Sequence, residues 1–145
     1  MGTIMSRSKL ILSVLLTVIS TNALAETSKC NCEGERCIPL MKPSVLTGML
    51  TSQQGRLVLQ LPELTCFVGS GDLNLDGADG ADYPTQSSIQ LSLATNMDMN
   101  TASRNVGNEI EVAGRLYAWH TAWHIKPVIM DVTSFKVAPP ASAPN

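Results

Sequence analysis

The sequence has 145 residues, 44% of them hydrophobic, and a formal net charge of −2. This length allows one domain with a modest core rather than two. An acidic chain without a basic stripe argues against a nucleic-acid partner, because neutralisation of phosphates supplies most of that affinity.

The first 25 residues have the pattern of a secretory signal peptide. Arg7 and Lys9 precede the apolar run Leu10–Ile19, and a small-x-small cleavage site follows at Ala23–Ala25. The run is too short to cross a bilayer, which argues against the alternative of a membrane anchor. Residues 1–25 hold two of the ten basic residues and no acidic one, so the cleaved chain has a formal charge of −4. We therefore expect a periplasmic or secreted protein with no membrane span after cleavage.

All four cysteines follow the cleavage site, and an even number in an exported chain indicates two disulfides. A bond between Cys30 and Cys32 is disfavoured because its tight ring strains the Cα geometry. Two pairings remain open, Cys32–Cys37 with Cys30–Cys66, or Cys30–Cys37 with Cys32–Cys66. A thiolate metal site on the first three cysteines is a less favoured alternative, because export promotes oxidation. Residues 26–42 are thus expected to be an irregular, disulfide-linked N-terminal extension.

Residues 43–137 are predicted to form one mainly β domain, and residues 138–145 a flexible Pro/Ala-rich tail. Ser44–Leu50 and Arg56–Leu61 flank a turn signal and predict a hairpin. Pro62 is expected to end the second of these strands. The further predicted elements are an edge segment at Thr65–Val68, a strand at Ser88–Leu93, a short helix or irregular crossover at Asn96–Val106, and strands at Glu109–Trp119 and Val128–Phe135.

This order of elements is that of a small five-stranded Greek-key barrel of the OB type. Thr47-Gly48-Met49-Leu50 is echoed by Ala113-Gly114-Arg115-Leu116. Long strands of a small barrel must coil sharply, and glycine permits the bend. We therefore expect these two strands to lie side by side and close the barrel. A sandwich or an open meander is the alternative.

Several short motifs resemble a family that is defined only as a domain of unknown function and is found in small exported bacterial proteins. The resemblance covers about Ser44 to Val132 and implies fold and export rather than an activity. Family members resembling this chain carry a histidine-rich connection before the last strand. The two histidines are four positions apart here rather than adjacent, so no shared metal or catalytic role is carried over. The motifs are Leu46–Leu50, Pro62 with Cys66, Gly107–Leu116, and His120 with His124 before Pro127-Val128.

The first candidate site is the connection that contains both tryptophans and both histidines of the chain: Trp119, His120, Trp123 and His124. Tryptophan offers a flat stacking surface, and histidine offers a donor, an acceptor or a metal ligand. In an OB barrel this connection flanks the ligand face. The alternative without a binding role is a hairpin whose tryptophans cap the barrel end and whose histidines are solvated. A zinc or copper site on the two histidines is a weaker alternative, because no third ligand is evident.

The second candidate site is an Asp-rich loop that matches the first half of an EF-hand calcium loop. Alternating oxygen ligands followed by glycine can wrap around one hard cation. The match fails at position twelve, where Tyr83 replaces the expected glutamate. A solvated Asp/Gly loop is the alternative. The candidate calcium ligands are Asp72, Asn74, Asp76, Ala78 and Asp82.

Catalytic signatures are missing from the sequence: no serine has a G-x-S-x-G context, and no phosphate-binding glycine motif is present. We therefore expect a non-enzymatic periplasmic binding module for a protein or small-molecule ligand. The alternative is a periplasmic inhibitor or immunity protein that blocks a protein partner, such as a cell-wall-degrading toxin. A small-ligand module should have a concave aromatic groove, whereas an inhibitor should present a protruding loop to a basic cleft.

Overall fold

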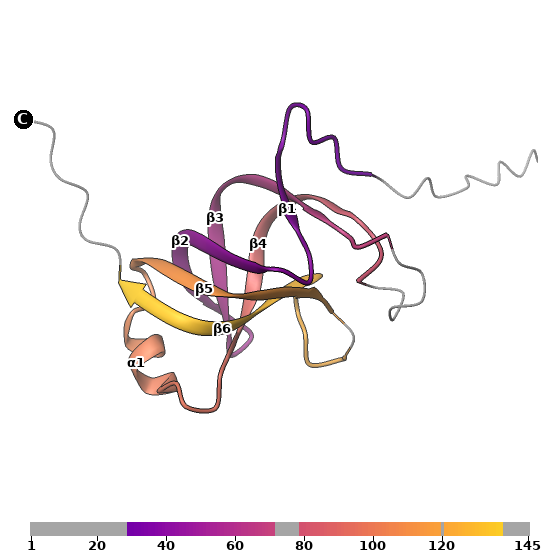
Figure 1. Cartoon of the computed structure of the whole chain (residues 1–145). Coiled ribbons are helices and arrows are strands. Elements are labelled where there is room, and N and C mark those ends of the chain that lie inside the picture. Colours follow the sequence, from indigo (N-terminus) through magenta and orange to yellow (C-terminus); the bar gives the residue numbers. More distant parts are fainter. Residues whose placement is uncertain (1–28, 72–78, 120, 138–145) are drawn as a thin grey trace, which may run out of the picture.

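The computed structural model describes residues 29–71, 79–119 and 121–137 (Figure 1). The predicted signal peptide and the predicted C-terminal tail lie outside these residues. Within them, no helix has both the length and the apolar character needed to cross a membrane. The described part is mainly β, as predicted. Its elements are β1 (Arg36–Pro39), β2 (Pro43–Gln53), β3 (Arg56–Val68), β4 (Tyr83–Leu93), α1 (Met99–Arg104), β5 (Glu109–Ala118) and β6 (Val128–Val137).

Strands β2 and β3 form the predicted hairpin. Gln53 pairs with Arg56, so the turn has only two residues between the strands. These are Gln54 and Gly55, with φ of 50° and 73°. Positive φ at both central positions matches the right-handed twist of the flanking strands, which is why glycine is favoured there. This turn places Arg56 at the start of β3, where its side chain lines the candidate site.

The strand pairings form a closed ring. Strand β3 pairs with β2, β2 with β5, β5 with β6, β6 with β4, and β4 pairs back with β3. Only the β4–β6 pair in this ring is parallel. Figure 1 shows the strands curving around a common centre, with α1 at one end. Short helix α1 connects β4 to β5, as one of the two predicted alternatives, and Asp98 caps it by accepting a hydrogen bond from the amide of Asn100.

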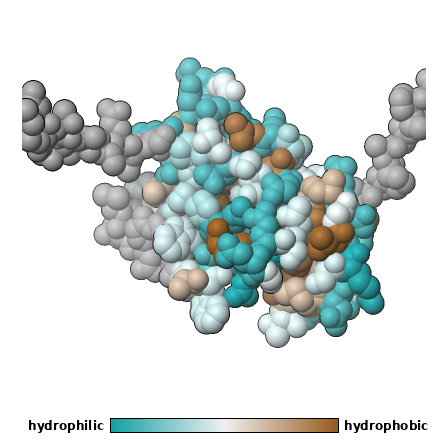
Figure 2. All heavy atoms as spheres, turned by 180° about the vertical axis from the view of Figure 1, so that it is seen from behind, coloured by the Kyte–Doolittle hydropathy of each residue, from teal (hydrophilic) through white to brown (hydrophobic). Residues whose placement is uncertain are grey.

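The core lies inside this ring. Ile89 and Leu91 on β4 belong to it, and the other strands of the ring contribute large buried side chains as well. On the face seen in Figure 2, apolar residues form separate small patches among polar ones. Burial of apolar area inside the ring is therefore the main stabilising term. The largest fully buried side chains include Leu46, Leu50, Leu59, Phe67, Ile110, Leu116, Ile129 and Met130.

The two glycines of the repeated motif lie on neighbouring strands, as predicted. Strands β2 and β5 are paired, with Gly48 opposite Ile110. A Cβ atom on Gly48 would lie 2.1 Å from the carbonyl oxygen of Gln60, and one on Gly114 would lie 2.0 Å from that of Asp131. The β5–β6 register also shifts at Gly114. Each glycine therefore permits a close approach of the adjacent backbone.

Two expectations about strand limits were wrong. The extension at residues 26–42 contains β1, which pairs in parallel with β3 and places Cys37 opposite Cys66. A strand of four residues is too short to show a hydrophobic period in the sequence, and it is defined by its pairing with β3. Pro62 does not end β3, because it lies between Gln60 and Thr65, where the β3–β4 register shifts. The amide that proline lacks is not needed at such an irregularity.

The disulfides follow one of the two pairings left open by the sequence. Cys30 bonds Cys66, and Cys32 bonds Cys37. No cysteine is free among the described residues, and all four are used in these bonds, so the thiolate metal alternative is wrong. Cys66 is buried. The first bond therefore fixes the N-terminal segment to β3 at a buried position next to Phe67, whereas the second closes a short exposed loop.

Candidate functional site

The connection between β5 and β6 exposes both of its tryptophans. Trp119 donates its amide to the carbonyl of Pro127 at 3.0 Å, which closes the connection at its base. The amide of His124 donates to the carbonyl of Thr121 at 3.2 Å, forming a turn inside it. Trp119 is 49% exposed and Trp123 is 72% exposed. Both tryptophans are therefore exposed to a large extent rather than buried as caps over the core.

Gln90 on β4 holds this connection against the sheet. Its Oε1 accepts a hydrogen bond from the amide of Ile125 at 2.8 Å, across 35 positions of sequence. Gln90 is only 5% exposed. A partly buried hydrogen bond between uncharged groups typically contributes about 1 kcal/mol, and this one fixes the connection next to β4. No local pattern indicates this role, because the partner amide lies 35 positions away in the sequence.

A groove of about 250 Å³ lies beside the connection. Its walls come from the turn and first residues of β3 (Gly55–Leu57), the end of β4 (Gln90–Leu93), the start of α1 (Met99), and Trp123 with His124. Four segments distant in sequence therefore meet at one hollow. Of the residues predicted for this site, the structure brings Trp123 and His124 into the groove. Trp119 is exposed in the same connection, and His120 lies outside the described residues.

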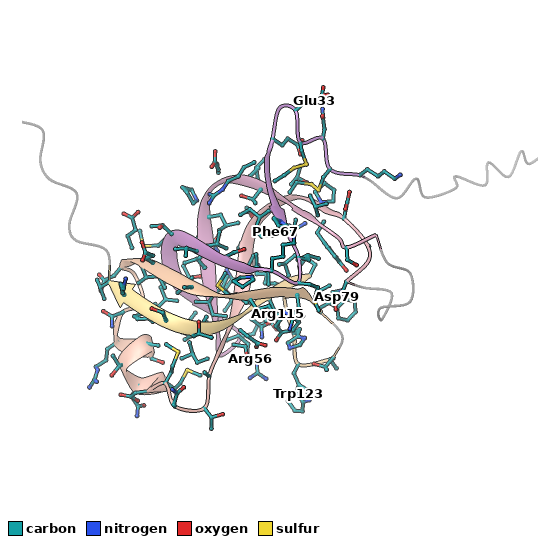
Figure 3. All side chains as sticks on the ribbon, in the orientation of Figure 1. Glu33, Arg56, Phe67, Asp79, Arg115 and Trp123 are labelled. Carbon is teal, nitrogen blue, oxygen red and sulfur yellow. A yellow bond between two sulfur atoms is a disulfide. The ribbon has the colours of Figure 1, made fainter. Side chains whose placement is uncertain are left out.

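Trp123 and His124 are each positioned by a neighbouring side chain. The guanidinium carbon of Arg56 lies 5.7 Å from the centroid of the Trp123 ring, a cation–π contact (Figure 3). The His124 ring meets the edge of Tyr117 with a centroid distance of 6.0 Å. The Thr121 hydroxyl lies 3.5 Å from His124 Nδ1. These contacts give the exposed rings a preferred orientation.

A second hollow, of about 290 Å³, lies next to Tyr117. Asp79, Arg115 and Asp131 line it together with Tyr117. Asp79 is 8% exposed, and its Oδ1 accepts the amide of Ala118 at 2.7 Å. The calcium hypothesis included the loop before Asp79 but assigned Asp79 no role. Its structural role depends on a contact 39 positions away, which sequence spacing does not show.

Burial raises the pKa of Tyr117 to about 12, and the charge of Asp131, to which its hydroxyl is hydrogen-bonded, adds to the effect. The side chain of Ser92 acts in the opposite direction by a hydrogen bond of its own. Tyr117 therefore stays a neutral hydrogen-bonding group on this face at any ordinary pH. Tyr83 also has a raised pKa, first because of burial and then because of Asp79.

Tyr117 gives a testable pH dependence. Its pKa is raised on folding, so the unfolded chain loses the proton first, near pH 10, and the folded protein near 12. The stability that this group contributes is fully present below pH 10 and falls as the pH rises toward 12. The chain has two tyrosines, so Tyr117→Phe leaves Tyr83 as the only tyrosinate signal. The difference between the tyrosinate absorbance titrations of the wild-type protein and this variant reports Tyr117 alone. We expect this difference to have its midpoint near pH 12. A midpoint near 10 would contradict the assignment.

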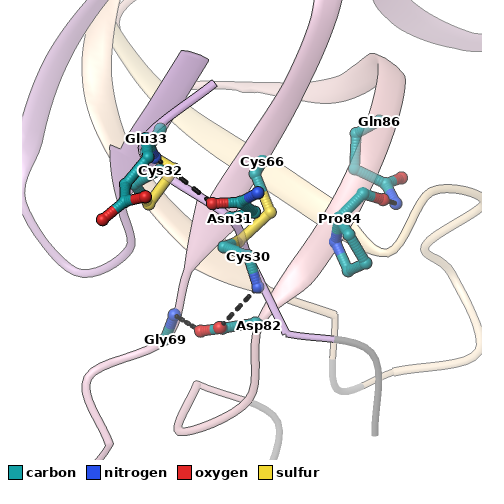
Figure 4. The surroundings of a disulfide bond; sticks show 10 residues. Cys30, Asn31, Cys32, Glu33, Cys66, Gly69, Asp82, Pro84 and Gln86 are labelled. Atoms are coloured by element: carbon teal, nitrogen blue, oxygen red, sulfur yellow. Dashed lines mark hydrogen bonds between the residues drawn. A yellow bond between two sulfur atoms is a disulfide. The ribbon is translucent and has the colours of Figure 1, made fainter. Parts of the chain in front are cut away.

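Asp82, a predicted calcium ligand, has a structural role in the folded chain. Its Oδ2 accepts the amide of Cys30 at 3.0 Å, and its Oδ1 accepts the amide of Gly69 at 2.9 Å (Figure 4). One carboxylate thus ties the N-terminal segment to the end of β3. The remaining calcium candidates, Asp72, Asn74, Asp76 and Ala78, lie outside the described residues, so calcium binding stays a prediction.

Metal binding by the histidine pair also stays a prediction, because only His124 of the two is described. Among residues 29–71, 79–119 and 121–137, no three His, Cys, Asp or Glu side chains come together in a group that could hold a metal ion. The chemistry of the described groove is instead that of an exposed indole, a guanidinium and a buried amide. Such groups bind ligands by stacking, charge and hydrogen bonding.

Fold and groove together define a small, disulfide-linked β protein with an aromatic surface site. Residues 88–136 match the sequence model of DUF4431, a domain of unknown function. The match spans the second part of β4, α1, β5, the Trp119–His124 connection and most of β6. The predicted resemblance to an uncharacterised family is therefore confirmed, whereas its finer details, the paired glycine strands and the histidine-containing connection, stay predictions about that family.

Among solved structures, the chain is similar to a DUF3299 family protein from Pseudomonas aeruginosa PAO1, with 10% identity and a TM-score of 0.38. The alignment covers 69% of this chain and 63% of that one, so it spans less than two thirds of that protein. The sequence matches none of the curated proteins with which it was compared.

Proposed function

We propose that the protein is a non-enzymatic, exported binding module built on an OB-type barrel. The ring of β2, β3, β4, β6 and β5, with α1 between β4 and β5, supports the barrel, because this is the strand order of that fold. In OB barrels the turn between the first two strands and the connection between the last two flank the ligand face. Those two segments are the β2–β3 turn and the Trp119–His124 connection, which both border the groove.

The observation that carries the proposal is the placement of Trp123. Its ring is 72% exposed, yet it faces the Arg56 guanidinium, and its connection is anchored to the buried Gln90. A large aromatic side chain held in solvent by buried contacts is characteristic of a binding surface, where tryptophan and arginine dominate the energetics. The two disulfides support export, because such bonds persist in oxidising compartments.

The hydrogen bonds in the groove favour binding over hydrolysis. Ser92 is hydrogen-bonded to Tyr117, and the Thr121 hydroxyl lies 3.5 Å from His124 Nδ1. Nucleophilic catalysis needs a hydroxyl activated by a base within hydrogen-bond reach and oriented by a third group. Ser92, the hydroxyl that lines the groove, has its partner elsewhere. This supports a binding module rather than an enzyme.

The test is affinity capture from a periplasmic extract with the mature protein and with a Trp119→Ala/Trp123→Ala variant, followed by mass spectrometry of proteins and small molecules. We expect the variant to lose the captured ligand at least tenfold, since hot-spot aromatics contribute about 2 kcal/mol or more. Leu64→Ala/Val137→Ala removes two residues that are also exposed, 59% and 48%, but lie outside the groove, and it should bind normally. Full retention by the tryptophan variant would refute the proposed surface.

An inhibitor or immunity protein is the second candidate, and one observation favours it. The loop closed by the Cys32–Cys37 disulfide extends away from the sheet, with Glu33 at its outer end (Figure 3). Glu33 and Glu35 are both exposed, which suits insertion into a basic cleft. If Glu33→Lys/Glu35→Lys abolishes capture of a protein while the tryptophan variant retains it, this second function replaces the first.

A further inference from the structure

The charged lining of the groove is entirely positive. Arg56 is the charged residue among the side chains that line it, while Asp79 and Asp131 line the neighbouring hollow beyond Tyr117. An arginine guanidinium presents several N–H donors in a planar fork that matches a carboxylate. Cationic ligands would therefore meet no counter-charge in this groove, whereas an anionic group would meet one.

Gln90 adds a second donor, its side-chain Nε2, for which the described residues provide no hydrogen-bond partner. Its Oε1 is taken by the amide of Ile125, which fixes which end of the side chain is Nε2. No hydrogen bond among the described residues uses this Nε2. Yet no fully buried side-chain nitrogen or oxygen in the described part lacks a partner. Because Gln90 lines the groove and is 5% exposed, its Nε2 is reached from the groove and is set to donate to a ligand there.

Arg56 and Gln90 lie on the same side of the sheet. Gln90 pairs with Val58, and Arg56 precedes Val58 by two positions on the same strand. Residues related in this way are diagonal neighbours, about 7–8 Å apart, within reach of one group when the side chains are long. The guanidinium and the amide can therefore contact one acceptor group together.

The groove also has apolar lining, next to Arg56. The indole of Trp123 and the side chain of Met99, 72% and 54% exposed, both border it. An aromatic or otherwise flat body stacks favourably on such an indole. The ligand that fits both parts has a flat apolar body and an anionic acceptor at one end.

We propose that the groove binds a small organic carboxylate, with the carboxylate between Arg56 and Gln90 Nε2 and the flat body against Trp123. This inference rests on the proposed binding function and specifies its ligand class. Gln90→Glu is the sharpest variant, because it retains an oxygen for the Ile125 amide and replaces the donor by a second acceptor. The same variant places a negative charge against the ligand.

The test uses three probes that share one ring: benzoate, benzyl alcohol and benzylammonium. Each is titrated into ¹⁵N-labelled mature protein, and the Trp123 indole and Gln90 side-chain signals are followed by NMR. We expect benzoate to shift both signals with a dissociation constant of about millimolar, which is normal for so small a ligand. Benzylammonium should bind at least tenfold more weakly than benzoate. Gln90→Glu should weaken benzoate at least tenfold, while Gln60→Glu, which makes the same charge change outside the groove, should not.

Equal shifts with all three probes would show an apolar groove without carboxylate preference and would overturn the inference. Absence of any shift would overturn it as well, while the capture experiment with the tryptophan variant still decides the proposed function separately. If Gln90→Glu fails to fold, Arg56→Gln provides the same test, because Arg56 is a half-buried residue at the strand start. Retention of benzoate affinity by a folded Arg56→Gln would equally overturn the inference.

Discussion

Replacing Gly114 with alanine is expected to lower the free energy of unfolding by about 3 kcal/mol. The added Cβ would lie 2.0 Å from the carbonyl oxygen of Asp131 and 2.8 Å from its carbonyl carbon. Backbone atoms cannot swing aside as a flexible side chain can, so β5 and β6 must separate. For a domain of this size such a loss corresponds to roughly 10 °C or more in melting temperature. Urea denaturation followed by circular dichroism measures it.

Gly34 provides the matched control for this substitution. A Cβ atom on Gly34 would meet nothing within 4 Å, so Gly34→Ala should change stability by no more than about 0.5 kcal/mol. Gly48→Ala should resemble Gly114→Ala, since its Cβ would lie 2.1 Å from the Gln60 carbonyl oxygen. If Gly114→Ala were as stable as Gly34→Ala, the close approach of β5 and β6 would not be a constraint on this fold.

The glycine pair also shows what the sequence could predict about the fold. The strand at Ser88–Leu93 and the turn between Ser44–Leu50 and Arg56–Leu61 are indicated by local patterns, and the structure confirms both. The neighbouring positions of Gly48 and Gly114 followed from a repeated motif. Strand β1 could not be predicted, because four residues are too few to show an alternating hydrophobic pattern. The strand forms because these residues pair with β3.

The candidate site divides in the same way. Trp123 was found because an indole is rare in this chain and stands out in any connection. A role for Gln90 was not predicted, because it depends on the connection between β5 and β6, which places the amide of Ile125 2.8 Å from Gln90 Oε1. Arg56 was likewise predicted only as the start of a strand, and its contact with Trp123 was not. Residues that gain a role from long-range packing leave no local pattern, so spacing alone cannot identify them.

Removal of the Cys30–Cys66 disulfide, by substituting both cysteines with alanine, is expected to lower the free energy of unfolding by about 4 kcal/mol. The two cysteines are 36 positions apart, so the bond greatly restricts the unfolded chain. Cys32 and Cys37 are only 5 positions apart, and their removal should cost about 2 kcal/mol in the same treatment. Denaturant unfolding of both double variants, without reductant, measures the difference.

The position of Cys30 makes this comparison informative about the fold as well. Its amide is also held by Asp82, and β1 pairs with β3 close to Cys66, so the N-terminal segment has non-covalent attachments besides the disulfide. If the long-range bond were the main attachment, its loss should also release β1 and expose the β3 edge to hydrogen exchange. If the two double variants were equally stable and that edge stayed protected, the Asp82 clamp and the strand pairing would hold the segment without the disulfide. Comparing the stability losses of the two double variants therefore shows whether the disulfide or the non-covalent contacts hold the N-terminal extension.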